Sequence, residues 1–262
     1  MSADTIPVVE MRGIVKSFGP VQALRGVDLR LRRREVLGLV GDNGAGKSTL
    51  MKVLTGVHQP DKGQIIFEGR PVQFSSPHAS RAIGIEMVYQ DLALAGNLSV
   101  DANIFLGREM HRTYLGGLVK LLDHKGMTRE AVRLLERLRI DIKSVAYRVE
   151  TLSGGQRQAV AIGRSAGFDA KVVIMDEPTA ALAVKEVGKV LDLIQGLKDH
   201  DVSIILISHR MQDIFAVCDH IMVLRQGRKV GDISRAETSM DEIVALITGS
   251  QESALQEIWE AT

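Results

Sequence analysis

The chain has 262 residues, 45% of them apolar, which is enough for a substantial core and near the upper limit for one domain. Its 33 Lys and Arg residues almost balance its 32 Asp and Glu residues, and aromatic residues make up only 4%. This composition argues against a generally basic nucleic-acid binder with stacking platforms. Cys218 is the only cysteine, so no disulfide can form within the chain, as is typical of a reducing cytoplasm. We expect it to be a small core residue.

The first seven residues show no charged start followed by an apolar run, so we expect no signal peptide. The longest strongly apolar runs are Val36–Val40 and Ser203–Ile207, and both are far too short to cross a bilayer. We therefore expect a soluble chain. A role in transport would require separate membrane subunits.

The first ninety residues have mainly strand patterns. The predicted elements are strands at Val8–Val15, Val27–Leu31 and Glu35–Val40, a helix over Lys47–Leu54, a hairpin turning at Glu68-Gly69-Arg70, and a strand over Gly84–Tyr89. The run Glu35–Val40 is apolar and ends at a glycine-rich segment, which predicts a buried parallel strand. The run Arg32-Arg33-Arg34 before it predicts a solvated turn.

From Leu92 to about Val149 the pattern becomes helical. Apolar residues fall at helical spacing beside charged ones between 129 and 138, and Thr128 is the expected cap of this helix. Gly116-Gly117 interrupts the middle of the segment. We interpret the segment as a helical insertion.

Strand patterns return at Lys171–Met175 and Val202–Ile207, each preceded by a helix-like stretch. This β-α-β-α order predicts a parallel sheet with helices on both faces. A hairpin is expected around residues 225–228, followed by short helices at Met240–Ile247 and Leu255–Trp259.

The segment from Gly41 to Thr49 matches the phosphate-binding P-loop G-x-x-x-x-G-K-[ST]. Its glycines let several backbone N–H groups point inward, and the following helix start adds to the attraction for a triphosphate. Lys47 should reach the β- and γ-phosphates, and the Ser48 hydroxyl should bind Mg²⁺. The expected nucleotide-binding residues of this loop are Gly41, Asn43, Gly44, Ala45, Gly46, Lys47, Ser48 and Thr49.

Asp176 and Glu177 end an apolar strand, where a carboxylate faces the ligand crevice of an open α/β sheet. Asp176 is expected to hold Mg²⁺, through water. The alternative is that both are solvated turn acids before Pro178.

A second anion-binding helix start is predicted at Ser153-Gly154-Gly155-Gln156, where Ser153 would be the cap and the glycine N–H groups would stay open. The alternative is an ordinary capped helix. One chain thus carries two phosphate-binding devices but only one P-loop.

These motifs, in the order P-loop, Gln90, Leu152–Gln156, Val172–Glu177, Ala180–Ala183 and His209, resemble those of the ATP-binding cassette (ABC) ATPases. The resemblance extends from about Val8 to about Thr248. The stretches Val88–Ala95, Asn103–Glu109 and Glu177–Leu182 are most similar to the single-cassette ATPase subunits of bacterial monosaccharide importers of the ribose, fructose and xylose type.

The resemblance implies roles for single residues. Glu177 would be the general base that polarises the attacking water, and His209 would contact the γ-phosphate. Gln90 would join the catalytic and Mg²⁺-binding set, Thr49 would touch the α-phosphate, and Phe18 would stack on adenine. The alternative for Phe18 is a buried core aromatic.

The sequence departs from the family pattern in three places. Ala183 replaces the Asp that often ends the D-loop, and Arg34 replaces a Gly before Glu35. Gly163 and Gly167 fall inside the helix predicted after Ser153, where each costs about 1 kcal/mol relative to Ala. Packing must offset that cost.

The expected fold is α/β: a P-loop NTPase core with a mostly parallel sheet, an N-terminal antiparallel β subdomain and an inserted α-helical subdomain. We expect one nucleotide-binding domain over 1–249, with its core at 1–91 and 158–249, the insertion at about 92–157 and a tail at 250–262.

The expected ligands are ATP and Mg²⁺. The resemblance implies pairing with a second cassette, which would cover each ATP with its signature, and docking of the insertion on permease subunits at the cytoplasmic face of the membrane. A sugar-binding protein would be an indirect partner, and no nucleic acid is expected.

Three alternatives remain open at this point. The chain could energise an importer of amino acids or lipids. It could be a soluble cassette ATPase acting on DNA or ribosomes, although it lacks the paired cassettes, zinc cysteines and basic extensions typical of those. A P-loop small-molecule kinase is disfavoured by the signature run and Glu177.

Overall fold

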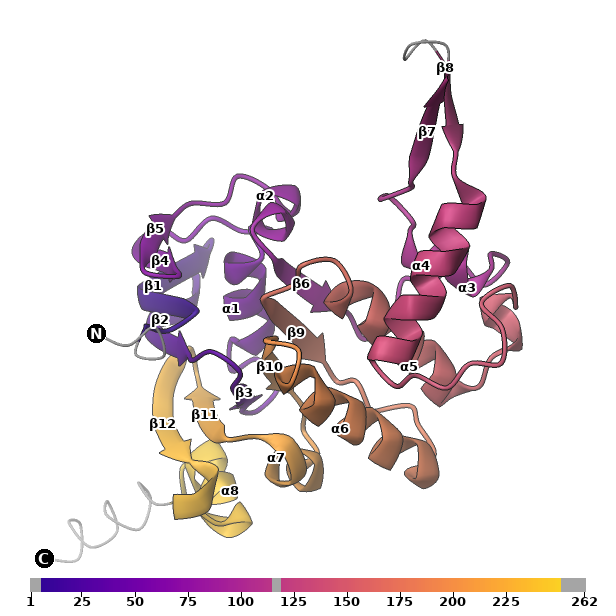
Figure 1. Ribbon diagram of the computed structural model, residues 1–262. Coiled ribbons are helices and arrows are strands. Elements are labelled where there is room, and N and C mark those ends of the chain that lie inside the picture. The colour runs from indigo at the N-terminus through magenta and orange to yellow at the C-terminus, as the bar shows by residue number, and fades with distance from the viewer. Residues whose placement is uncertain (1–5, 115–118, 251–262) are drawn as a thin grey trace, which may run out of the picture.

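The computed structural model describes residues 6–114 and 119–250. It has a central sheet with helices on both sides, a smaller antiparallel sheet near the N-terminus, and a helical part at the other end from which a ribbon of two strands projects (Figure 1). The fold class predicted from the sequence is confirmed.

The central sheet has six strands. Five run parallel and the edge strand β12 is antiparallel; in spatial order they are β12 (Arg228–Ser234), β11 (His220–Arg225), β3 (Val36–Val40), β10 (Ser203–Ile207), β9 (Val172–Asp176) and β6 (Ile85–Val88). The inner strands β3 and β10 are buried at every residue, as their continuous apolar runs predict.

The antiparallel sheet has the order β2 (Val21–Leu31), β1 (Val9–Phe18), β4 (Lys62–Phe67) and β5 (Arg70–Val72). The predicted hairpin turn between β4 and β5 is present, with φ values of 47° at Glu68 and 78° at Gly69. Two successive left-handed residues match the twist of the flanking strands.

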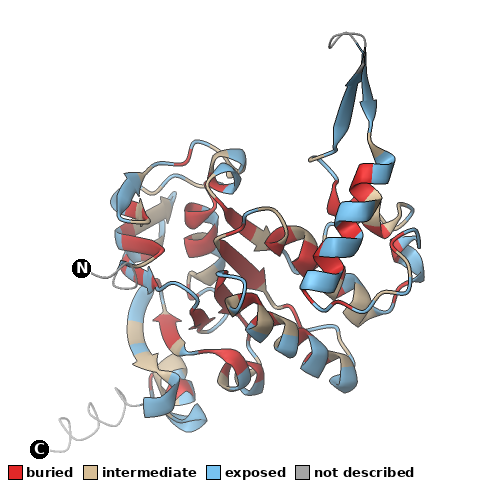
Figure 2. Ribbon diagram, in the orientation of Figure 1, coloured by how far each residue is buried: buried red, intermediate tan, exposed pale blue. Residues whose placement is uncertain are grey.

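The central sheet divides the core in two. Helix α1 (Lys47–Leu54) buries four residues in the cluster between the antiparallel sheet and one face of the central sheet. Helices α5 (Gly154–Ala166), α6 (Val184–Lys198) and α7 (Met211–Val217) contribute to the cluster on the other face, with α8 (Met240–Thr248) beside β11 and β12. Figure 2 shows the central strands as the most continuously buried part. A short helix α2 (Pro77–Ala82), capped by Ser76, was not predicted.

The insertion is not wholly helical, which corrects the sequence interpretation. Between α3 (Val100–Ile104) and α4 (His124–Arg137), strands β7 (His111–Tyr114) and β8 (Val119–Leu122) form an antiparallel ribbon that projects from the domain (Figure 1). The β-forming residues around Gly116-Gly117 were the available signal. Residues 115–118 themselves lie outside the described part.

The predicted cap of α4 was wrong. Asp123 is the cap, and its carboxylate accepts a hydrogen bond of 2.9 Å from the N–H of Gly126. Thr128 lies inside the helix, where its hydroxyl contacts the His124 carbonyl oxygen at 2.9 Å and Asp101 Oδ2 at 2.6 Å. A short polar residue close to the true start can imitate a cap in sequence.

Only one of the two glycines expected inside α5 is there. Gly163 is helical, and a Cβ added to it would lie 3.0 Å from Ile140 Cδ1, so close packing against the α4–α5 connection explains the glycine. Gly167 is the C-cap residue rather than an interior one.

Arg34 lies in an exposed turn, as the run Arg32-Arg33-Arg34 predicts. Its φ is 57°, a conformation that glycine favours.

Helix α5 runs across the predicted boundary at residue 157 without a break, so the division into core and insertion stays a prediction. The helix expected at Leu255–Trp259 and most of the tail lie outside the described residues. Over the ranges 6–114 and 119–250, no helix is both long and apolar enough to cross a membrane.

Cys218 is a core residue, as predicted. Its side chain is 2% exposed, and burial raises the pKa of its thiol well above the ordinary value. A Cβ added to Gly38 of β3 would lie 3.0 Å from Cys218 Sγ, so the thiol packs against the sheet where only glycine fits.

Asn103 of α3 fastens the loop that precedes this helix. The side chain is fully buried; Oδ1 accepts from the Ala95 N–H at 2.8 Å, and Nδ2 donates to the carbonyls of Ala95, Ser99 and Leu98 at 2.9, 3.0 and 3.3 Å. A buried polar residue with every bond inside the loop holds the backbone in one conformation.

We predict that Asn103→Leu lowers the free energy of unfolding by about 3 kcal/mol, because the loop groups lose their partners inside the protein. Urea unfolding measures the change. The matched control is Asn97→Leu in the same loop, where the side chain is exposed and the change should be within about 0.5 kcal/mol. Equal effects of the two substitutions would contradict the assignment.

Candidate functional site

The register of the parallel sheet brings the predicted site residues to one edge. Ile207 of β10 pairs with Leu39 of β3 on one side and with Asp176 of β9 on the other, and Met175 pairs with Val88 of β6. The P-loop, Glu177, His209 and Gln90 each follow one of these strands within two residues. Their segments therefore leave the sheet at the same carboxyl edge, where open α/β sheets bind ligands.

The P-loop has the backbone that its glycines predict. Gly41, Gly44 and Gly46 have φ values of 147°, 83° and 106°. Helix α1 begins directly after Gly46, and no side chain caps it. The first N–H groups of α1 are therefore available to an anion.

The Lys47 ammonium lies over the loop that carries it, donating to the carbonyl oxygens of Gly41 at 2.6 Å and Asp42 at 3.0 Å. Burial lowers the pKa of Lys47, while the negative charges of Glu177, Asp176 and Asp42 act in the opposite direction. Lys47 thus lies within electrostatic reach of both strand-end carboxylates, and Lys52 also acts on Asp176.

Asp176 is half-buried at the end of β9. Burial raises its pKa and the neighbouring charge of Glu177 raises it further, while Lys47 lowers it. A nearby cation stabilises the charged form of a carboxylate whose pKa is raised by burial and by a second carboxylate. The Ser48 hydroxyl, the exposed Gln90 amide and the Asp176 carboxylate each offer the oxygen ligands that Mg²⁺ prefers, so the chemistry of these residues fits that ion.

Glu177 is held at the tips of two strands. Its φ is 51°, its N–H donates to the Ile207 carbonyl at 2.9 Å, and its Oε1 accepts from the backbone N–H of His209 at 3.0 Å. Oε2 is buried and accepts no hydrogen bond, although His209 Nδ1 lies 2.8 Å away. The left-handed backbone of a non-glycine residue is strained, and such strain persists where the surroundings fix it.

Phe18 ends β1 and its side chain is 44% exposed, so the alternative that it is a core aromatic is wrong. Its ring lies edge-on to the His58 ring at 5.1 Å. Phe18 pairs with Val21 of β2. Ala23, two residues further along β2, lies against the P-loop, because its carbonyl oxygen would be 2.8 Å from a Cβ built on Gly46. The strand that Phe18 pairs with therefore runs beside the P-loop.

Ser153 caps α5 as predicted. Its hydroxyl accepts from the Gln156 N–H at 3.2 Å, and its own N–H donates to Gln156 Oε1 at 3.1 Å, which is a complete capping box. The neighbours of Gly154 and Gly155 are Leu182 and Glu186, not the P-loop. The two helix starts that the sequence predicts to bind phosphate thus have different neighbours.

Two contacts escaped the sequence analysis. Arg164 of α5 donates to the carbonyl oxygens of Ala93 and Leu92 at 2.9 and 3.0 Å, which ties the helix that starts at Ser153 to the segment after Gln90. Thr179, after the strand-end acids, donates to the buried Asp213 of α7. Both contacts join residues more than thirty positions apart, and no local pattern signals them.

The family model for ABC transporters matches residues 24–180. The chain belongs to the ABC transporter family. This match includes the P-loop, Gln90, the signature at Ser153–Gln156, and Asp176 with Glu177.

Several relatives match nearly the whole chain. A xylose/arabinose import ATP-binding protein, XylG, from Sulfolobus acidocaldarius is 45% identical over 92% of this chain and 94% of its own. A fructose import ATP-binding protein, FrcA, from Rhizobium meliloti is 46% identical over 94% of this chain and 95% of its own. A ribose import ATP-binding protein, RbsA, from Chromobacterium violaceum is 44% identical, and the chain spans 47% of its length.

Solved structures agree on the fold. A nucleotide-free ATP-binding cassette from an ABC transporter superposes with a TM-score of 0.78 at 27% identity, covering 93% of this chain and 96% of the other. A dimeric cassette bound to ADP and Pi has a TM-score of 0.70 at 21% identity over 87% of this chain and 98% of its own, which shows a shared fold alone.

We predict that Gly41→Ala destabilises the nucleotide-free protein far more than Gly44→Ala does. A Cβ on Gly41 would lie 2.1 Å from the Leu224 carbonyl oxygen, whereas a Cβ on Gly44 meets no atom within 4 Å. Gly44→Ala should cost about 1 kcal/mol of unfolding free energy, from its left-handed backbone alone. Gly41→Ala should cost more than about 3 kcal/mol, because backbone must move.

Urea unfolding without nucleotide measures both values. Equal destabilisation by the two substitutions would contradict the packing at Gly41.

Proposed function

We propose that the chain is the ATP-hydrolysing subunit of an ABC importer that takes up a monosaccharide. The observation that carries the proposal is the common carboxyl edge, where the P-loop, Asp176, Glu177, Gln90 and His209 meet through the strand register. A bound triphosphate would place its γ-phosphate between Lys47 and these groups.

In this proposal different residues bind the base, the phosphates and the metal ion of the nucleotide. The exposed ring of Phe18 stacks on adenine, Thr49 contacts the α-phosphate, and the backbone N–H groups of Gly41–Gly46 surround the β-phosphate. Lys47 leaves the carbonyl oxygens of Gly41 and Asp42 and bonds the β- and γ-phosphate oxygens. Exchanging neutral acceptors for charged ones strengthens its hydrogen bonds.

Ser48, Asp176 and Gln90 are the residues that would hold Mg²⁺. When bound, this ion would neutralise part of the phosphate charge beside two carboxylates. Asp176 would also keep its carboxylate ionised more readily, because the cation opposes the effect of burial on its pKa.

Glu177 is placed to act as the general base. Its Oε1 is fixed by the His209 N–H, and its buried Oε2, which accepts no hydrogen bond, has the His209 ring nitrogen 2.8 Å away. Once that ring turns to the γ-phosphate, Oε2 would be the acceptor for a proton of the attacking water. His209 follows the next strand and would hydrogen-bond the γ-phosphate with its ring. Gln90 would orient the water from the β6 side.

The signature at Ser153–Gln156 needs a nucleotide from elsewhere, since its own neighbours are Leu182 and Glu186. In the proposal, two cassettes pair so that each signature covers the ATP on the partner's P-loop. Closing and reopening of this pair would drive separate permease subunits, on which the insertion docks from the cytoplasmic face of the membrane.

The assignment to monosaccharides rests on the relatives at 44–46% identity, whose names are those of xylose/arabinose, fructose and ribose import proteins. The alternatives are import of an amino acid or a lipid, and action on DNA or ribosomes. The near-neutral composition argues against the last of these.

We predict that Glu177→Gln lowers steady-state ATP hydrolysis by at least about a hundredfold while ATP still binds, because an amide cannot accept the proton from water. Lys47→Ala should instead weaken ATP binding, because it removes the charge facing the β- and γ-phosphates. Hydrolysis is followed by phosphate release, and binding by titration with a fluorescent ATP analogue. Hydrolysis near the wild-type rate in Glu177→Gln would remove that residue as the base.

We predict that deleting the gene abolishes uptake of at least one radiolabelled pentose or hexose. Reintroducing the wild-type chain should restore uptake, whereas the Glu177→Gln chain should not, which links transport to hydrolysis. Unchanged uptake of every monosaccharide, together with a defect in amino-acid or lipid uptake, would overturn the sugar assignment alone.

A further inference from the structure

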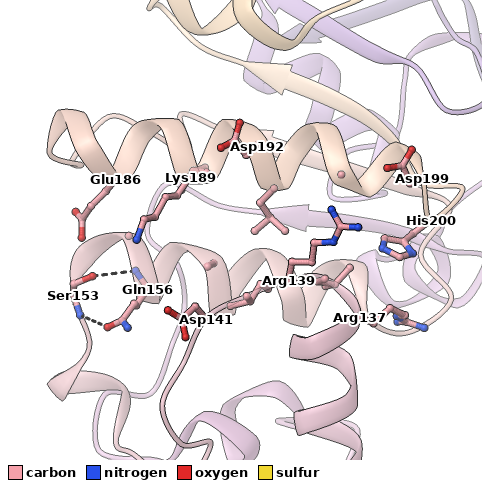
Figure 3. A pocket seen from close by; sticks show the side chains of 17 residues that line it. Arg137, Arg139, Asp141, Ser153, Gln156, Glu186, Lys189, Asp192, Asp199 and His200 are labelled. Carbon is pink, nitrogen blue, oxygen red and sulfur yellow. Dashed lines mark hydrogen bonds between the residues drawn. The ribbon is translucent and has the colours of Figure 1, made fainter.

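A groove of about 550 Å³ runs between helices α5 and α6, and its end at the start of both helices contains the signature (Figure 3). There the side chain of Glu186, from α6, points toward Ser153 and the first turn of α5. A Cβ on Gly155 would lie 2.9 Å from Glu186 Cβ and 3.0 Å from its Cδ, and one on Gly154 would lie 3.6 Å from Oε2. The carboxylate thus lies against the open backbone of both signature glycines.

The contacts of this carboxylate come from two helix starts. The Ser153 hydroxyl and the Gly155 N–H at the start of α5 face it, as does the Ala183 N–H at the start of α6. These groups, Ser153 first, lower the pKa of Glu186 and so favour its anionic form. Donors of this kind at a helix N-terminus are those that a phosphate group would use.

The replacement of Asp by Ala at position 183 makes the contact more important to α6. Ala183 is the N-cap residue of α6 and offers no side-chain hydrogen bond. Glu186 lies at the third helical position, where an acidic side chain can reach back to the cap N–H. Its carboxylate therefore faces the start of α6 and the signature at once.

We propose that Glu186 is an internal anion that occupies the signature's phosphate position in the nucleotide-free subunit, and that ATP-driven pairing of two cassettes must displace it. The proposal rests on the proposed function, in which the signature binds the γ-phosphate of the partner's ATP. Two anions cannot use the same hydroxyl and N–H donors, and like charges brought together oppose association.

Once displaced, the Glu186 carboxylate can pair with the ammonium of Lys189. Lys189, one turn further along α6, faces the same end of the groove, and its charge already acts on Glu186 (Figure 3). Residues three apart on a helix are neighbours, so Glu186 can turn to Lys189 without unwinding α6. The signature then becomes free, and its availability depends on the balance between Glu186 and the incoming phosphate.

The test measures ATP-induced dimerisation in a Glu177→Gln background, by size-exclusion chromatography with light scattering over a range of ATP concentrations. Adding Glu186→Gln should lower the ATP concentration for half-maximal dimer by about tenfold, because the like-charge opposition is gone. Glutamine also serves at this capping position, so α6 should be kept. A merely structural role would predict the opposite direction, since loss of the contact would weaken the dimer.

The matched control is Asp192→Asn, which removes the same charge from the same helix and groove but away from the signature. It should leave the half-maximal ATP concentration within about twofold. Binding of a fluorescent ATP analogue to the monomer should be the same in all these proteins, because the P-loop is untouched.

The outcomes separate the two proposals. If the Glu177→Gln parent binds ATP but does not dimerise, the proposed pairing of cassettes fails, and this inference fails with it. If the parent dimerises, and Glu186→Gln matches Asp192→Asn or needs more ATP, the inference alone is overturned.

Discussion

The parallel pairing of β10 with β3 and β9 is the constraint on which the rest of the structure depends. Hydrogen bonds fix the register of these strands, and the register decides which residues leave the sheet together. Because each strand ends in a different motif, a shift of one strand would separate the P-loop from Glu177. The two apolar clusters on either face of the sheet stabilise this one alignment.

The edge formed in this way concentrates charged groups that are partly buried. It gathers two adjacent carboxylates and a half-buried ammonium. Burial raises the pKa of Asp176 and lowers the pKa of Lys47, so both residues are pushed toward their neutral forms. Glu177 in addition holds a left-handed backbone. Groups of this kind bind a ligand of complementary charge more strongly. Perturbed pKa values gathered at one edge are typical of a functional site rather than of a stabilising one.

The sequence analysis succeeded where chemistry is carried by a short motif. The P-loop conformation, the capping box at Ser153 and the strand ends could be predicted because each depends on a few adjacent residues. It failed where the determinant lies elsewhere in the chain. The bonds of Arg164 join residues 71 and 72 positions apart, and no local pattern records them. The cap of α4 and the β7–β8 ribbon are local by contrast, and there the sequence analysis chose Thr128 over Asp123 and a helix over a hairpin.

The two hydrogen bonds from Arg164 to the backbone after Gln90 affect which parts of the sequence can change during evolution. The Arg164 guanidinium holds the carbonyl oxygens of Leu92 and Ala93, groups that every amino acid carries. The path of this segment beside Gln90 is therefore fixed without reference to its side chains. Leu92 packs against the core, but Asp91 and Ala93 are exposed, so mutation can alter these two side chains while the hydrogen bonds to the backbone remain. A surface of this kind can acquire new specificity while the carboxyl edge beside it stays the same.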